Sequence, residues 1–234
     1  EGVMRQRAHA SSLPGLLKWL YRRARDLGNL ADALSFSEAL FWRHPVVQGY
    51  QELKEVADGL GRWDEVRASV LGKLASGDQY ATLTELYLSE EEIALALETL
   101  QRVPQRQGYW YGADSLQIRV ARAAEETQPE AALQLYLREV EQLIKLQGRA
   151  NYALAARHLQ RVRDLYRGRG QGQTWQSLIG SLREQHRRLP ALKDEMHQAG
   201  LFAPEPQAAP PESVAPSKAA VVRLLRSPDA PYER

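Results

Sequence analysis

The sequence predicts an all-α fold, built as an α-solenoid of antiparallel helix pairs over residues 13–202. Three observations carry this prediction. Apolar residues recur at three- and four-residue spacing, which is the period of an amphipathic helix. Glycine, proline and capping residues separate these stretches. A pattern of two helices joined by a Leu-Gly turn recurs after about 33 residues.

The first predicted helix has an apolar stripe from Leu16 to Leu27 and ends at Gly28, and the second follows Asn29. Gly28 corresponds to Gly61 one period later. A Leu-Gly turn between two helices, with small residues before it and a bulky one after it, resembles the tetratricopeptide pattern. Because no single pair could bury its own stripe, we expect the pairs to share one continuous core.

The third pair is predicted between Gln79 and Val103. Ser89 and Glu92 match the Ser-x-x-Glu capping box and predict the start of its second helix. The run Glu90-Glu91-Glu92 then lies in a first helical turn, where the helix dipole favours acidic side chains. The predicted buried face of this helix consists of Ile93, Leu97 and Leu100.

The clearest periodicity lies between Pro129 and Tyr166, where two helices of about 17 to 19 residues are predicted. Pro129 is expected to start the first and Asn151 to cap the second. Thr174 and Pro190 are expected to start the last two helices.

Outside residues 13–202 the composition changes. Residues 1–12 form a polar lead, and residues 203–234 form a Pro- and Ala-rich tail that we expect to be disordered. Within the tail, residues 218–226 form a short amphipathic segment. The chain begins with Glu1 rather than Met, so we expect an N-terminal neighbour to be missing.

The net charge is only +2, so no global field selects nucleic acid or a membrane as partner. Counted along the sequence, residues 78–141 carry about −7 and residues 142–203 about +7. The absence of cysteine excludes disulfides and thiolate metal sites and fits a reducing compartment. With no apolar run of roughly 18 residues and no signal peptide, we expect a cytoplasmic protein without membrane contact.

The C-terminal half resembles the helical region of bacterial SWIM zinc finger proteins. The matching features include Pro129, Ala132 and Tyr136 in one helix and the closing Ala199-Gly200-Leu201. In that family the helical repeats follow a zinc module of the type Cys-x-Cys then Cys-x-His. This chain has no cysteine, so the resemblance implies an interaction scaffold and no zinc site here.

No motif in the sequence indicates catalysis. The histidines are expected at the disordered start, a helix end and helix surfaces, and none has metal-ligand spacing. His186 lies on an apolar stripe, where we expect a packed side chain. There is no Gly-x-Ser-x-Gly elbow and no phosphate loop, so the sequence predicts no enzyme, no cofactor and no small-molecule substrate.

A basic cluster within residues 149–193 is the first candidate binding surface. It could bind phosphate, or its arginines could pair with the acidic segment before it. A second candidate is the run Tyr109, Trp110 and Tyr111, which could anchor a partner or fold over a helix groove. The arginines singled out for partner binding are Arg157, Arg161, Arg167, Arg183, Arg187 and Arg188.

These observations favour a noncatalytic protein–protein interaction scaffold, the helical part of a larger SWIM-type protein. The alternative is a nucleic-acid-binding helical domain that uses the arginine-rich helices of residues 149–193.

Overall fold

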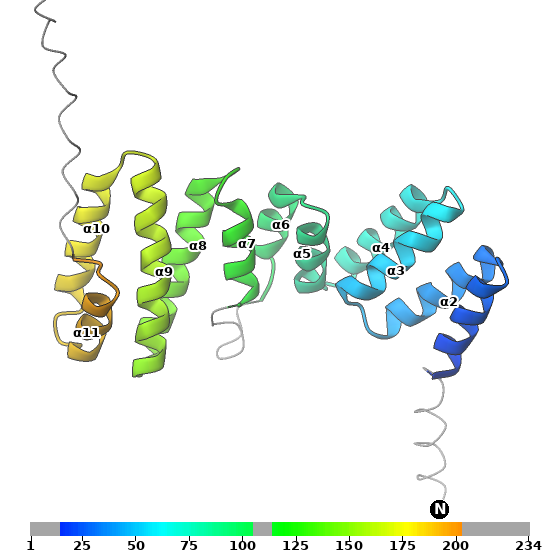
Figure 1. Cartoon of the computed structure of the whole chain (residues 1–234), viewed down its shortest axis with the longest axis horizontal. Coiled ribbons are helices and arrows are strands. Elements are labelled where there is room, and N and C mark those ends of the chain that lie inside the picture. The colour runs from blue at the N-terminus through cyan, green and yellow to red at the C-terminus, as the bar shows by residue number, and fades with distance from the viewer. Residues whose placement is uncertain (1–14, 105–113, 203–234) are drawn as a thin grey trace, which may run out of the picture. The chain divides into compact units, whose positions relative to one another are not determined.

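A computed structural model describes residues 15–104 and 114–202, and this part of the chain is helical with no strand (Figure 1). The predicted all-α class is therefore confirmed. The polar lead, the aromatic run Tyr109–Tyr111, and the tail with its segment 218–226 lie outside the described residues.

Ten labelled helices follow a first helical segment at residues 15–26. They are α2 (Leu30–Arg43), α3 (Val47–Gly59), α4 (Trp63–Ser76), α5 (Tyr80–Ser89), α6 (Ile93–Leu100), α7 (Leu116–Ala124), α8 (Pro129–Leu146), α9 (Arg149–Gly168), α10 (Gly172–Gln185) and α11 (Pro190–Gln198). Consecutive helices pack against each other from α2 to α9, and α9 also contacts α10 and α11. The two long helices of the central stretch are 18 and 20 residues, close to the prediction.

The predicted glycine turns are confirmed. Gly28 has φ 71° and Gly61 has φ 66°, in the left-handed region where a side chain would be strained. The amide of the following residue bonds back to the helix in both turns, Asn29 N to Ala24 O and Arg62 N to Ala57 O, each at 2.9 Å. This hydrogen bond identifies a Schellman ending, which satisfies carbonyl groups at the end of each helix.

Glu91 has the same left-handed conformation without being glycine, with φ 60° between α5 and α6. We expect Glu91→Gly to raise the free energy of unfolding by about 0.5–1 kcal/mol because it removes this strain. Glu91→Ala is the matched control, since it also removes the carboxylate but keeps a Cβ. Chemical denaturation should show the glycine variant to be the more stable of the two. Equal stabilities would mean that the backbone at Glu91 is unstrained.

Buried side chains form two clusters, so the expectation of one continuous core is wrong. One cluster extends from Tyr21 to Leu86 and the other from Val103 to Leu201, and the half-buried Tyr80 packs against both. At the contact between α5 and α6, Thr84 and Thr99 share a buried hydrogen bond of 3.0 Å, and Leu97 and Leu100 of α6 are only half-buried.

Three predicted helix starts are also wrong. Ser89 ends α5 and donates to Leu86 O, so it does not cap α6, whose N-cap is Glu92. Asn151 lies inside α9 and donates to Gln147 O. Thr174 lies inside α10, which begins at Gly172. The predicted buried face of α6 is likewise only half-buried, and its fully buried residues are Ala96 and Thr99.

Candidate functional site

Part of the predicted basic cluster surrounds an open hollow between α7 and α9, with a volume of about 500 Å³. We call it the basic hollow. Arg122 comes from α7, and the remaining cations come from α9, where Arg157 and Arg161 are four residues apart and share a face. Its lining residues include Arg122, Arg157, His158, Arg161, Arg163 and the acidic Asp114 and Asp164.

Most of these arginines have a carboxylate partner. Arg161 binds both carboxylate oxygens of Glu125, and Arg163 pairs with Asp164 at 3.1 Å. Arg122 lies 3.8 Å from Asp114, too far for a hydrogen bond. Within the described ranges Arg157 has no hydrogen-bond or ion-pair partner. Internal pairing, the alternative considered for the basic cluster, thus accounts for part of it.

His158 was expected on a helix surface but is buried, with 6% of the residue exposed. Its ring packs against Tyr136, with 5.9 Å between ring centroids. Burial, and then the charges of Arg122 and Arg157, lower the pKa of His158 to about 4, so the ring is neutral at neutral pH. Its buried Nε2 has no hydrogen-bond partner among the described residues.

The other predicted arginines lie away from this hollow. The Arg183 guanidinium lies 5.6 Å from the centre of the Phe202 ring, and Arg187 pairs with Glu184 at 3.1 Å. Arg188 is exposed in the turn between α10 and α11, and Arg167 is exposed near the end of α9. Of the predicted partner-binding arginines, Arg157 and Arg161 line the hollow.

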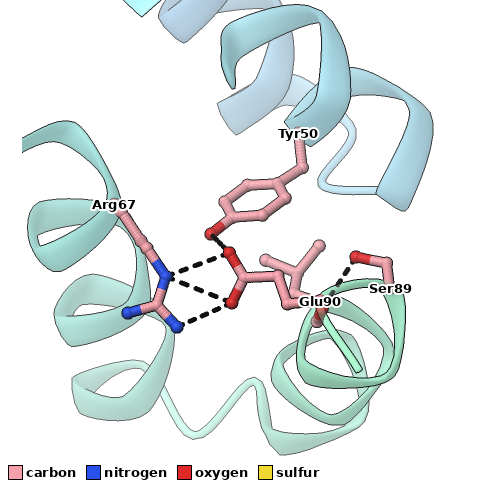
Figure 2. A network of polar contacts seen from close by, with 5 residues as sticks. Tyr50, Arg67, Ser89 and Glu90 are labelled. Atoms are coloured by element: carbon pink, nitrogen blue, oxygen red, sulfur yellow. Dashed lines mark hydrogen bonds and ion pairs between the residues drawn. The ribbon is translucent and has the colours of Figure 1, made fainter. Parts of the chain in front are cut away.

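A polar network that the sequence analysis missed connects α3, α4 and the end of α5 (Figure 2). Arg67 binds both oxygens of the Glu90 carboxylate at 2.7–3.1 Å, and Tyr50 donates its hydroxyl to the same carboxylate at 2.8 Å. Glu90 is the C-cap of α5, where the helix dipole disfavours negative charge. Its placement in a favourable first turn was wrong, and the arginine compensates for the dipole.

The pKa values of this network show that it holds a charged carboxylate. Burial opposes ionisation of Glu90, but hydrogen bonds from Arg67 and Tyr50 outweigh it and lower the pKa of Glu90. Burial and the bond to Glu90 raise the pKa of Tyr50, so its hydroxyl stays protonated.

The same chemistry recurs beside the basic hollow. Glu125 is the C-cap of α7, accepts the Tyr136 hydroxyl at 2.6 Å and binds Arg161. Burial, and then the bond to Glu125, raise the pKa of Tyr136 to about 12. Two helix ends thus carry the same tyrosine–glutamate–arginine network.

A second open hollow, of about 460 Å³, lies beside Glu90. We call it the Trp63 hollow, and Tyr50, Lys54, Trp63, Arg67 and Glu90 are among its lining residues. The Lys54 ammonium lies 5.6 Å from the centre of the half-buried Trp63 ring, within reach of a cation–π interaction. This surface offers an aromatic ring next to mixed charges.

In the described residues, no three His, Asp or Glu side chains are grouped so as to hold a metal ion. No helix described by the structure has both the length and the hydropathy to cross a bilayer.

Comparison with known proteins gives one curated relative. The chain is 35% identical over 74 residues to the uncharacterized protein YwqB of Bacillus subtilis (strain 168). The matched part is 32% of this chain but spans only 14% of the relative's length. No family model and no solved structure matches the chain.

Proposed function

We propose that this chain is a noncatalytic scaffold that binds another protein, and that its helix pairs stack as a tetratricopeptide-like solenoid. The contacts of α3 with α5 and of α5 with α7 support the stacking, since alternate helices lie side by side in such arrays. The resemblance to SWIM proteins supports a place within a larger protein. Its cytoplasmic location stays a prediction.

One observation carries the choice of a protein partner, namely the mixed charge of both hollows. In the basic hollow, Asp114 and Asp164 lie among the arginines, and in the Trp63 hollow Glu90 lies beside Lys54 and Arg67. A nucleic acid presents a row of negative phosphates, which these carboxylates would repel. A protein surface can match both signs of charge and can use Trp63 as an aromatic contact.

Site-specific photocrosslinking tests this proposal in the organism that encodes the chain. A benzophenone amino acid replaces Lys54 or Arg157 in the two hollows, or Arg138 on α8 as an exposed control. We expect discrete protein adducts from the hollow positions and none from Arg138. Adducts to nucleic acid alone, or identical adducts at all three positions, would contradict a protein-binding scaffold.

The nucleic-acid alternative makes a separate prediction for purified protein. Binding through two or three phosphates would give a log–log dependence of affinity on salt with a slope of about −2 to −3. Our proposal expects no such salt-dependent binding of an oligonucleotide.

A further inference from the structure

Two arginines of the basic hollow have hydrogen-bonding groups left to use. The closest acid to Arg122 lies 3.8 Å away, and Arg157 has no partner in the part of the chain that the structure describes. His158 lines the same hollow, and its Nε2 is buried without a partner among the described residues. Because this nitrogen is buried, a ligand in the hollow does not reach it, and the two arginines are the groups that can bind one.

The net charge of these side chains indicates how many negative charges a ligand should carry. Arg161 and Arg163 are already neutralised by Glu125 and Asp164. Arg122 and Arg157 contribute two positive charges, and Asp114 offsets one of them. Since His158 is neutral, one positive charge remains, which suits one monoanion rather than a chain of phosphates.

We propose that Arg122 and Arg157, beside the buried His158, form a subsite for one carboxylate of an acidic side chain on the partner protein. The planar guanidinium fork of arginine matches the two oxygens of a carboxylate. His158 lines the hollow beside both arginines, so its ring senses the charge of a bound group. This inference rests on the proposed protein-binding function and names the chemistry of one contact in it.

The test uses the full chain and a fluorescein-labelled hexaglutamate peptide at low ionic strength, with hexaglutamine as the uncharged comparison. We expect fluorescence anisotropy to show binding of hexaglutamate only. Arg157→Ala should weaken it by about tenfold, because a hydrogen bond to a charged group is lost. Arg138→Ala, an exposed arginine on α8 outside the hollow, should bind as the unchanged chain does.

The His158 ring gives a second readout, which a purely structural histidine would not show. The charged or titratable groups recorded around it are Arg122 from α7, Tyr136 from α8 and Arg157 from α9. A bound carboxylate stabilises the imidazolium form, so hexaglutamate should raise the pKa of His158 from about 4. NMR titration of the labelled ring measures this shift, and Arg157→Ala should reduce it.

Three results would overturn the subsite. The first is no binding of hexaglutamate, and the second is equal binding of hexaglutamate by Arg157→Ala. The third is tighter, Arg157-dependent binding of a hexathymidylate, which would assign the hollow to phosphate. Photocrosslinking distinguishes failure of the subsite from failure of the proposed function. A protein adduct at Lys54 would still support a protein-binding scaffold, even if the carboxylate subsite were rejected.

Discussion

Trp175→Ala is expected to lower the free energy of unfolding by about 3–5 kcal/mol, the range for removing a large buried aromatic side chain. Trp175 on α10 is completely buried and is one of the largest side chains in the C-terminal cluster. Its removal leaves a cavity that the helices of that cluster can close only in part. Urea denaturation followed by circular dichroism measures the loss.

Trp175→Phe is the matched control. The indole Nε1 is buried and has no hydrogen-bond partner among the described residues, so phenylalanine gives up no recorded polar contact. We expect this variant to lose about 1–2 kcal/mol, well below the alanine variant. Equal losses for the two variants would mean that the indole N–H, rather than the ring volume, stabilises the fold.

Glu90→Ala is expected to destabilise the chain by about 2–3 kcal/mol. The change leaves Arg67 without its carboxylate and the buried Tyr50 hydroxyl without an acceptor. We expect a smaller loss than for a fully buried ion pair, because the Arg67 side chain is 32% exposed. Removing the negative charge from the C-cap of α5 also removes its unfavourable interaction with the helix dipole, which offsets part of the loss. Urea denaturation measures the loss. Glu55→Ala is the control, since its pair with Arg25 is exposed and should cost less than 1 kcal/mol.

The pH dependence of stability follows from the lowered pKa of Glu90. Because the folded pKa lies below the unfolded one, this stabilisation is present above the unfolded value of about 4.3 and is lost as pH falls through the folded value. Glu90→Gln has no charge to lose, so its stability should fall less on acidification. Parallel pH profiles for the two proteins would contradict a charged, stabilising Glu90.

The sequence predicted the fold class because helix signals are local. Apolar spacing placed the helices, and Gly28 and Gly61 ended them as expected. Capping was less predictable, because Ser89 and Asn151 can bond to helix ends or to the preceding turn, and the backbone path decides between them.

The candidate surfaces were predicted less completely, because their contacts join residues that are far apart in the sequence. Local charge density identified the arginines of α9, but the partners of Arg161 and Arg67 lie 36 and 23 residues away. The burial of His158 had a local signal, since it follows Leu154 and Ala155 at helical spacing and lies next to Leu159, within the apolar stripe of α9. The run Tyr109–Tyr111 stays a prediction.

The tyrosine–glutamate–arginine networks at the ends of α5 and α7 also constrain how the chain can diverge. Replacing Glu90 alone leaves Arg67 and Tyr50 without their acceptor, so we expect it to cost more stability than replacing all three residues together. The same holds for Glu125 with Arg161 and Tyr136. Tyr50 and Glu90 are 40 residues apart and meet only in the folded chain. We therefore expect each set to be inherited, or lost, as a unit.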